Sequence, residues 1–389
     1  MLKIAFIVGE ASGDKLGAAL IDGFDAILSE PPECIGVAGP VMMDRGMNSL
    51  FDMHELSVMG ITEILPQYLH LRRRLNQTVD YILDQKPDVL ITIDAPEFCL
   101  RVAKAVKAKS NIPTVHYVAP TVWAWRPKRA AHMAPFIDHV LALFPFEPKL
   151  MQAAGMSCDF VGHPVSHDQI ATPDEAAQFR RDFELNDAPV ALCLPGSRMS
   201  EIKRMGPVFS ETIKRVHELR PDLKWVLPAA PNVAGALSQM IEEWPIKPIL
   251  LDPRELDKDR AAMLKRSAFR AADIALAASG TVSLELAANE TPMVIAYDMN
   301  WLSRLIIGRM LLVDTVNLIN LVTNTRFVPE FIGKNCKPAK IAPAVLQLLG
   351  NSQNQHIVME TTMRTLGRND EQPGIRAAKS VLRYLKIGF

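Results

Sequence analysis

Apolar residues gather along this chain in short runs that alternate with longer stretches where they recur every three or four positions. Short apolar runs are typical of strands buried in a parallel sheet, and the longer spacing is typical of helices packed on such a sheet. Helical spacing is clear in LRVAKAVKAK at 100–109. Predicted strands occupy residues 3–8, 88–94, 113–118, 139–144, 190–194, 223–227, 248–251, 273–278 and 292–297.

The alternation of strands and helices occurs twice, on either side of the polar stretch SHDQIATPDEAAQ at 166–178. Repeated strand–helix units form parallel sheets with helices on both faces. We therefore expect the α/β class, with two doubly wound Rossmann-like domains facing a cleft. The first would span residues 1–165 and the second residues 166–350. Ligands of such sheets bind beyond the carboxyl ends of the strands, which directs attention to the loops that follow them.

Composition excludes several classes of protein. The chain has 389 residues, 49% of them hydrophobic, and its 43 basic residues match its 43 acidic ones. This balance gives no basic field for nucleic acid. Five scattered cysteines without a CxxC pair argue against a disulfide framework or a thiolate metal site and indicate a reducing cytosol. The first apolar run is too short for a signal peptide, and no run reaches the length of about 20 residues of a membrane-spanning helix.

Two loops have the composition of phosphate-binding segments, PGSR at 195–198 and SGT at 279–281, and each follows a predicted strand. The first half opens in a similar way, with GEASGD at 9–14 after its leading strand. A glycine lets a ligand approach the backbone, a helix start offers N–H groups, and the Arg198 guanidinium suits a phosphate. Each loop by itself also fits a tight turn or a helix cap. Two such loops in the second half favour nucleotide binding, with Glu285 as a candidate acceptor for ribose hydroxyls.

Other nucleotide motifs are missing from the sequence. Neither leading strand is followed by GxGxxG, which argues against a nicotinamide dehydrogenase, and no GxxxxGK[ST] supports a P-loop enzyme. The DKD at 257–259 resembles the metal-binding DxD of some glycosyltransferases. It lies in a charged run that fits a solvated helix start better.

Asp94 is a candidate general base, because it ends a predicted strand at the start of a loop. It fits equally well as the N-cap of a helix that begins near Pro96. Glu10 and Asp14, in the first loop, are its rivals for the role. His163 is more typical of a residue that braces the hinge than of a catalytic one.

Two further segments carry unusual mixtures of residues. HYVAPTVWAWRPKR at 116–129 places two tryptophans beside basic residues, which suits a substrate with a sugar or acyl part and a phosphate, or a packed core corner. LSVMGITEILPQYLHLRRRL at 56–75 has the composition of a helix on anionic lipid, and also of a helix facing a core. On the lipid hypothesis, its contacting residues are Val58, Met59, Ile61, Leu65, Leu69, Arg72, Arg73 and Arg74.

Six motifs occur in an order that resembles one known family. They are GEASGD, YVAPTVWAWRPKR, FVGHP, LPGSR..EI, SGTVSLELA and VNLINLV...VPEFI. Together they resemble the lipid-A-disaccharide synthases, glycosyltransferases of the two-domain GT-B fold, over essentially the whole chain. The resemblance implies inverting, metal-independent transfer from UDP-2,3-diacylglucosamine to 2,3-diacylglucosamine 1-phosphate. The products would be a β(1→6) tetraacyl disaccharide 1-phosphate and UDP.

The resemblance also implies roles for individual residues. Asp94 would be the catalytic base, with Glu10 and Asp14 as rivals, and no cofactor or metal is expected. Ser12 and Gly13 would face the acceptor. The UDP-binding residues would be Gly196, Ser197, Arg198, Ser279, Gly280, Thr281, Glu285 and Asn320. In GT-B enzymes the last helix returns to the first domain, so residues 351–389 are expected to pack there.

Relatives of this kind are peripheral membrane proteins, because both substrates carry acyl chains. The resemblance thus implies a cytoplasmic protein on the inner face of the inner membrane, attached through residues 56–75. A homodimer is expected, and nucleic acid is not an expected partner. Two alternatives are a UDP-sugar epimerase of the same fold and a non-catalytic UDP-sugar-binding protein at the membrane.

Overall fold

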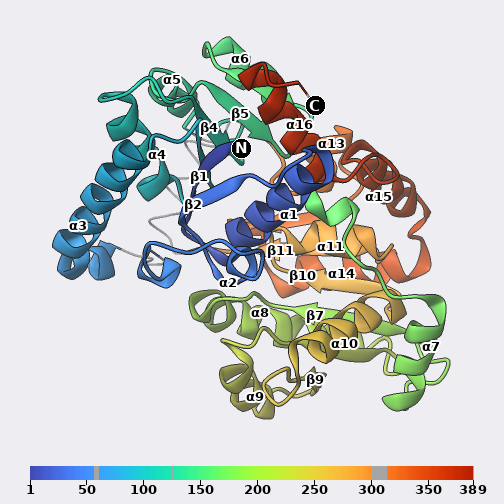
Figure 1. The fold of residues 1–389 in the computed structure, drawn as a ribbon. Helices are drawn as coiled ribbons and strands as arrows, with labels where there is room; N and C mark the ends of the chain where they lie inside the picture. Colours follow the sequence, from blue (N-terminus) through green and yellow to red (C-terminus); the bar gives the residue numbers. More distant parts are fainter. Residues whose placement is uncertain (57–60, 125, 300–312, 389) are drawn as a thin grey trace. The chain divides into compact units, whose positions relative to one another are not determined.

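The chain folds into two compact units, which are described separately below (Figure 1). The computed structural model describes residues 1–56, 61–124, 126–299 and 313–388. Unit 1 comprises Met1–His167 and Leu366–Phe389, and unit 2 comprises Asp168–Thr365.

Unit 1 is built on six parallel strands in the order β2-β1-β3-β4-β5-β6. The strands are β1 (Lys3–Val8), β2 (Glu33–Val37), β3 (Val89–Ile93), β4 (Thr114–Tyr117), β5 (His139–Ala142) and β6 (Ser157–Phe160). The described helices are α1 (Ala11–Ile27), α2 (Pro40–Met43), α3 (Ile61–Gln85), α4 (Pro96–Lys107), α5 (Lys128–Met133), α6 (Glu147–Ala153) and α16 (Pro373–Leu385), with 3-10 turns η1 (Met53–Leu56) and η2 (Pro164–Ser166).

Both faces of this sheet are buried, which explains the continuous apolar runs. Ala5 and Ile7 of β1 belong to a cluster with side chains of α3, α4, α5 and α6. Ile4, Phe6 and Val8 alternate with them and are equally inaccessible. Because successive side chains of a strand point to opposite faces, these three lie on the other side of the sheet. Helix α1 packs against β1 and β3, and α16 packs against β5.

The last helix of the chain lies directly against the first helix (Figure 1). Two glycines allow this approach. A Cβ atom on Gly374 would lie 2.1 Å from the carbonyl oxygen of Ala19, and one on Gly23 would lie 2.3 Å from the carbonyl oxygen of Gly374. Farther along α16, Ser380 Oγ lies 2.8 Å from His139 Nε2 of β5. Backbone contact and a buried polar contact therefore both attach α16 to unit 1.

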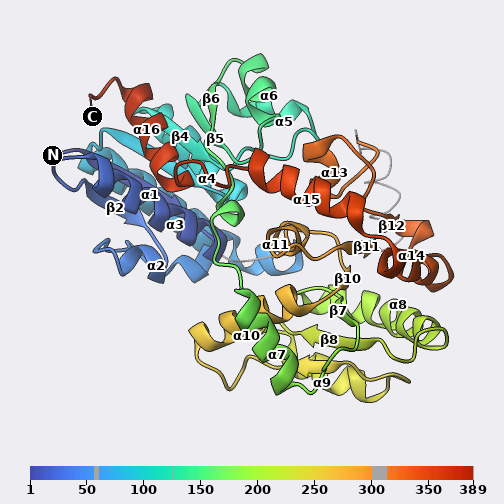
Figure 2. The ribbon, with the colours of Figure 1, turned by 90° about the vertical axis from the view of Figure 1, so that its right-hand side faces the viewer.

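Unit 2 repeats the architecture with six parallel strands in the order β12-β11-β10-β7-β8-β9 (Figure 2). The strands are β7 (Val190–Leu194), β8 (Lys224–Pro228), β9 (Ile249–Leu251), β10 (Ile274–Ala277), β11 (Met293–Tyr297) and β12 (Glu330–Ile332). The described helices are α7 (Pro173–Asp182), α8 (Met199–His217), α9 (Ala234–Glu242), α10 (Lys258–Ala271), α11 (Val282–Ala288), α13 (Leu318–Thr323), α14 (Pro338–Gly350) and α15 (Gln353–Thr365), with the 3-10 turn η3 (Gly333–Asn335).

The predicted α/β class with two doubly wound Rossmann-like domains is confirmed. All nine predicted strands are present, and their ends differ from the prediction by at most two residues. The units divide at 167/168 and 365/366, whereas the sequence placed these boundaries at 165/166 and 350/351. Helix α15 accounts for the second difference, since it packs on α11 and α13. Its Gln355 also accepts a 2.8 Å hydrogen bond from the Met293 N–H within unit 2.

Candidate functional site

In unit 1 the order of the strands reverses between β1 and β3, and the predicted acceptor-side loops follow these two strands. Such a switch point is where open α/β sheets bind ligands. Ser12, in the first turn of α1, donates a hydrogen bond of 3.4 Å from its Oγ to Asp94 Oδ2, directly after β3. The structure therefore brings these two predicted site residues together.

The backbone at Asp94 is held in an uncommon conformation. Asp94 and Ala95 have φ angles of +50° and +40°, in the left-handed region. An L-residue such as alanine occupies that region at a cost of about 1–2 kcal/mol. A Cβ atom on Gly9 would lie 2.7 Å from Ala95 Cβ, so the glycine makes room for this turn. The N-cap of α4 is Ala95, so the alternative interpretation of Asp94 as the N-cap is wrong.

The chemistry of Asp94 suits a proton acceptor. Its side chain is half-buried, and burial raises the pKa of its carboxyl group above the usual value. The Ala95 N–H and the Ser12 hydroxyl act in the opposite direction, because they stabilise the charged form. A raised carboxyl pKa brings the group closer to the pH at which a general base works best.

The other residues of the first loop have distinct surroundings. Asp14 is buried, and its carboxylate accepts hydrogen bonds of 2.8–3.1 Å from the N–H groups of Gly39, Val41 and Met42. It therefore holds the start of α2 instead of facing a substrate. Glu10 is half-buried at the N-cap position of α1 and remains a rival of Asp94. A Cβ atom on Gly13 would lie 3.3 Å from the Ile93 carbonyl oxygen, so Gly13 lets α1 pack against β3.

In unit 2 the order of the strands reverses between β10 and β7, which precede the two predicted nucleotide loops. The strands are direct neighbours, and the Ala278 N–H donates to the Leu194 carbonyl at 2.8 Å where both end. Loop 195–198 and loop 279–281 therefore start side by side. Ser279 is half-buried, whereas Gly280 and Thr281 are exposed.

The loop at 195–198 contains an acidic neighbour whose role the sequence analysis missed. Glu201 Oε2 accepts hydrogen bonds from the N–H groups of Ser197 at 3.0 Å and Arg198 at 3.3 Å. A Cβ atom on Gly196 would lie 2.5 Å from Glu201 Cβ, so the glycine makes room for this side chain. The carboxylate thus occupies N–H groups that we expected to hold phosphate. A Glu three residues after a helix N-cap is the signal that could have identified it.

The Arg198 guanidinium is 63% exposed, and its Nη1 lies 3.6 Å from Glu201 Oε1. This is a loose ion pair at the surface. Such pairs contribute little to stability, so the guanidinium can turn to an anionic ligand at low cost.

Glu285 and Asn320, both predicted to bind nucleotide, have polar partners within unit 2, and those of Asn320 are buried. Glu285 forms an ion pair with Lys265 of α10. Asn320 is fully buried, its Oδ1 accepts from the Val328 N–H at 3.1 Å, and its Nδ2 donates to the Val328 carbonyl at 2.9 Å. Nδ2 also lies 3.2 Å from Glu330 Oε2. A sequence cannot reveal that these polar groups are satisfied internally.

The DKD segment begins a helix, which confirms the interpretation favoured by the sequence. Asp257 is the N-cap of α10, and its Oδ1 accepts a 2.9 Å hydrogen bond from the Arg260 N–H. Among the residues that the structure describes, no group of three or more His, Cys, Asp or Glu side chains is placed to hold a metal ion.

A second carboxylate that the sequence analysis missed lies beyond β5. Glu147 is 2% exposed and accepts hydrogen bonds from the Leu143 and Phe144 N–H groups and from the Trp123 indole. Burial raises the pKa of Glu147 to about 7. The signal was an acidic residue in FPFEP at 144–148, directly after an apolar run. Nearby, burial lowers the pKa of His163 to about 4, and its backbone N–H donates to the Leu366 carbonyl at 3.0 Å.

The predicted lipid-binding segment lies only partly within the described residues. Val58 and Met59 are outside them, as are the side chains of Ile61 and Leu65. Leu69 is 73% exposed, and the side chains of Arg72 and Arg73 are exposed. Among the described residues, no helix is both long enough and apolar enough to cross a membrane.

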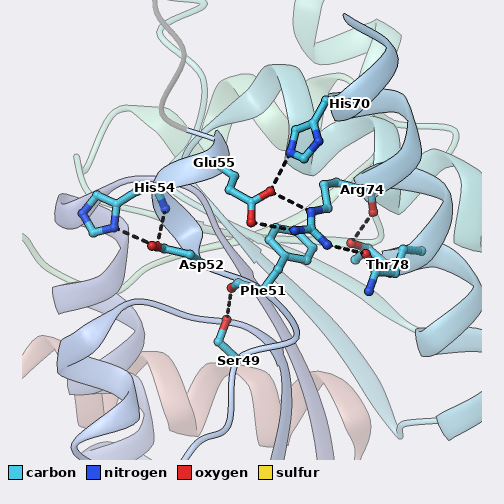
Figure 3. A network of polar contacts seen from close by, with 9 residues as sticks. Ser49, Phe51, Asp52, His54, Glu55, His70, Arg74 and Thr78 are labelled. Carbon is cyan, nitrogen blue, oxygen red and sulfur yellow. Dashed lines mark hydrogen bonds and ion pairs between the residues drawn. The ribbon is translucent and has the colours of Figure 1, made fainter. Parts of the chain in front are cut away.

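Arg74 differs from the two arginines before it (Figure 3). It forms two hydrogen bonds of 2.6 and 2.7 Å with Glu55 of η1, and its guanidinium lies 4.6 Å from the centre of the Phe51 ring. His70 Nε2 lies 2.6 Å from the same carboxylate. Figure 3 shows Arg74 and His70 converging on Glu55 from α3. Arg74 therefore joins α3 to η1 and is not available for lipid headgroups.

Comparisons with known proteins agree with this reading of the fold. A solved UDP-GlcNAc 2-epimerase from Neisseria meningitidis superposes with a TM-score of 0.64, covering 99% of this chain and 100% of that one, at 14% identity. At that identity the likeness concerns the fold alone, which is the GT-B arrangement of two Rossmann-like domains.

Sequence relatives are much closer. The lipid-A-disaccharide synthase of Ruegeria pomeroyi is 51% identical over 99% of this chain and 96% of its own length. That of Rhodospirillum centenum is 41% identical over 99% of this chain and 95% of its own length. The family model described as lipid-A-disaccharide synthetase matches residues 4–382. The loops that the resemblance singled out follow the strands at both switch points. The family match and the relatives together show that the chain belongs to the lipid-A-disaccharide synthetase family.

Proposed function

We propose that the protein is an inverting glycosyltransferase that joins UDP-2,3-diacylglucosamine to 2,3-diacylglucosamine 1-phosphate. The products are UDP and the β(1→6) tetraacyl disaccharide 1-phosphate of lipid A. The observation that carries this proposal is the family match over residues 4–382, together with a relative at 51% identity named lipid-A-disaccharide synthase. The match favours glycosyl transfer over epimerisation and over a non-catalytic sensor.

Unit 2 is proposed to bind the UDP part of the donor. The proposed contacts come from the switch point between β7 and β10, where two loops begin side by side. Arg198 supplies an exposed positive charge that stabilises the departing diphosphate. Asn320 supports unit 2 from within, so its contribution to binding is indirect. The direct contacts are assigned to Gly196, Ser197, Arg198, Ser279, Gly280, Thr281 and Glu285, whose ion pair with Lys265 is part-exposed.

Unit 1 is proposed to bind the acceptor and to supply the base. The acceptor hydroxyl attacks the anomeric carbon of the donor sugar, and a new C–O bond forms. The bond from that carbon to the diphosphate breaks, and its electron pair leaves with UDP. The hydroxyl proton passes to the carboxylate of Asp94, beside Ser12. Attack opposite the leaving group inverts the anomeric centre.

One assay tests the proposed function against its alternatives. The protein is incubated with acylated UDP-glucosamine, with and without the monosaccharide 1-phosphate. Disaccharide and UDP that form only with the acceptor support transfer. An isomerised UDP-sugar would identify an epimerase, and binding without turnover would identify a sensor. We expect activity to survive a chelator, and loss that a divalent ion restores would contradict metal-independent transfer.

Replacing Arg198 with alanine is expected to weaken UDP binding at least tenfold. A hydrogen bond to a charged group contributes about 1.5–3 kcal/mol, and about 1.4 kcal/mol corresponds to a factor of ten. The side chain is 63% exposed, so the fold does not depend on it. Calorimetric titration with UDP measures the effect, and unchanged affinity in the folded variant would remove Arg198 from the donor site.

Glu201→Gln is the matched control for Arg198→Ala. The substitution keeps an acceptor for the Ser197 and Arg198 N–H groups but removes the negative charge beside the guanidinium. UDP carries negative charge, so its affinity should stay the same or increase. Weaker UDP binding in Arg198→Ala, together with equal or tighter binding in Glu201→Gln, would support a diphosphate at this loop.

We further propose that the protein forms a homodimer. We also propose that it attaches to the inner face of the inner membrane as a peripheral protein.

The described part of the predicted lipid-binding segment supports attachment to the membrane. Leu69 is 73% exposed, and two exposed arginines follow it on α3. An exposed apolar side chain beside exposed cations is the composition of a surface that binds anionic lipid.

Leu69→Ser and the double variant Arg72→Ala/Arg73→Ala are expected to weaken binding to anionic vesicles in different ways. Each arginine contributes about 1 kcal/mol, and this contribution fades as salt is added. The leucine contributes about 1.5–3 kcal/mol, largely independent of salt. Co-sedimentation with vesicles across a salt series separates the two.

The controls for these variants are equally exposed residues elsewhere. Leu219 is 69% exposed in unit 2, and the Arg101 side chain is 63% exposed on α4. Leu219→Ser and Arg101→Ala should leave vesicle binding unchanged. Equal losses in the variants and the controls would mean that this part of α3 has no special role.

A further inference from the structure

Glu147 is a buried carboxylate whose hydrogen bonds connect two loops of unit 1. Its Oε2 accepts from the backbone N–H groups of Leu143 at 3.1 Å and Phe144 at 3.0 Å, directly after β5. Its Oε1 accepts from Trp123 Nε1 at 3.3 Å, in the loop after β4. A buried carboxylate needs such donors, and here one of them is a side chain from a different loop.

The indole that Glu147 holds is itself half-buried. Nε1 is the single polar atom of a tryptophan side chain, and it bonds to a carboxylate that is 2% exposed. The rest of the ring is apolar. The ring packs nearly perpendicular to that of Phe146, at 5.5 Å between ring centres, and Phe146 in turn stacks on Phe144 at 5.5 Å. Trp123 is thus fixed by a hydrogen bond at Nε1 and by aromatic packing against Phe146.

The loop that carries this ring begins next to the strand end that carries the proposed base. Strand β4 pairs with β3, and the Asp94 N–H donates to the Tyr117 carbonyl at 3.0 Å. The next residue, Val118, has φ of +81°, a conformation that a β-branched residue rarely adopts. Strain of this kind gathers at functional sites. The loops after β3 and β4 therefore both begin with strained turns at the carboxyl ends of neighbouring strands.

We propose that Glu147 is a positioning residue that fixes Trp123 as an apolar wall for the sugar ring or acyl chain of the acceptor. The inference rests on the proposed function, since it takes the acceptor to be an acylated glucosamine phosphate. Arg126 and Lys128 follow Trp123 and are exposed, so positive charge suited to the phosphate stands on the same segment. An apolar ring face is a suitable surface for sugar C–H groups and acyl chains.

The variants Glu147→Gln and Trp123→Phe test the proposal. Glutamine has one acceptor oxygen, so it cannot receive both the backbone N–H groups and the indole N–H. Phenylalanine keeps a ring but loses the donor. Each is expected to raise KM for the acceptor about tenfold, with a smaller change in kcat and no change in UDP affinity. Unchanged acceptor KM in both folded variants would overturn the proposal.

Asp138→Asn is the control, because it alters another hydrogen-bonded carboxylate of unit 1, at the opposite end of the strands. Asp138 precedes β5, and its Oδ2 accepts from Lys107 Nζ and from the backbone and hydroxyl of Thr114. The variant should lower the melting temperature without raising the acceptor KM. If Asp138→Asn raised that KM as much as Glu147→Gln does, the effect would be one of general stability, and the positioning role would fail.

A spectroscopic measurement separates this inference from the proposed function. The protein is labelled with 5-fluorotryptophan, and the Trp123 resonance is assigned by its loss in Trp123→Phe. Addition of 2,3-diacylglucosamine 1-phosphate in detergent should shift this resonance in the wild type, and Glu147→Gln should require more acceptor for the same shift. A shift without disaccharide synthesis would support the wall and contradict the proposed function. Synthesis without a shift would do the reverse.

Discussion

Asp94→Asn is expected to lower turnover by about 10²–10⁴, the range that a general base contributes. Asparagine keeps the shape of the side chain but cannot take the proton. It also tolerates the left-handed backbone that Asp94 adopts, with φ of +50°, so the fold should be preserved. UDP affinity should hardly change, because the nucleotide is assigned to unit 2. Steady-state kinetics and calorimetry on the same preparation measure both quantities.

The pH dependence gives a second measure of the same role. A base acts when it is deprotonated, so turnover falls as the pH drops through the pKa of Asp94. Burial raises that pKa, which moves the loss to a higher pH than for an ordinary aspartate. Asp94→Asn should remove this limb of the profile.

Ser12→Ala is the control for Asp94→Asn. The hydroxyl makes one 3.4 Å hydrogen bond to Asp94, at the long end for such contacts. Its loss should raise the pKa of Asp94 further and cost much less turnover than the loss of the carboxylate itself. Wild-type turnover in Asp94→Asn would transfer the role of base to Glu10, the nearest rival in the first loop.

Gly374→Ala is expected to have the largest effect on stability. Its Cβ atom would lie 2.1 Å from the carbonyl oxygen of Ala19, which belongs to the backbone of α1 and cannot rotate away. The two helices must separate, and overpacking of this kind costs about 1–3 kcal/mol. Urea denaturation should show a lower midpoint, with the slope as the check that one cooperative transition is being compared.

The same substitution at Gly350 should have the opposite sign. Gly350 ends α14, and a Cβ atom there would have no described heavy atom within 4 Å. Alanine in such a place stabilises by about 0.4–1 kcal/mol, because it restricts the unfolded chain. Equal effects of Gly374→Ala and Gly350→Ala would mean that the close approach of α1 and α16 is not what holds the last helix.

The sequence predicted every inner strand and the edge strand β9, and it missed the other three edge strands. The three strands that it missed are β2, β6 and β12, and each lies at the edge of its sheet. An inner strand is covered on both faces and flanked on both sides, which requires a continuous apolar run. Residues of β6 and β12 are mostly half-buried, and β2 contains Gly36. The formation of such strands depends more on hydrogen bonds to the neighbouring strand than on an apolar pattern in their own sequence.

The sequence located the loops of the candidate site but not the duties of their polar side chains. Asp14 and Asp94 are both aspartates that follow predicted strands, yet Asp14 is consumed by three backbone N–H groups and Asp94 is not. Glu201 likewise accepts a hydrogen bond from the Ser197 N–H, which the sequence assigned to phosphate. Whether a carboxylate serves the fold or a substrate depends on which distant N–H groups reach it. Spacing along the chain does not contain that information.

The attachment of α16 to α1 has a consequence for how the protein is made. The ribosome releases Met1–His167 first and then all of Asp168–Thr365 before the residues of α16 emerge. At about 5–20 residues per second, the 198 residues from 168 to 365 take about 10–40 s to synthesise. During that time the face of α1 around Gly23 has no helix to cover it. Unit 1 therefore matures last although it begins first, and a nascent chain stalled before residue 366 would present this uncovered face to chaperones.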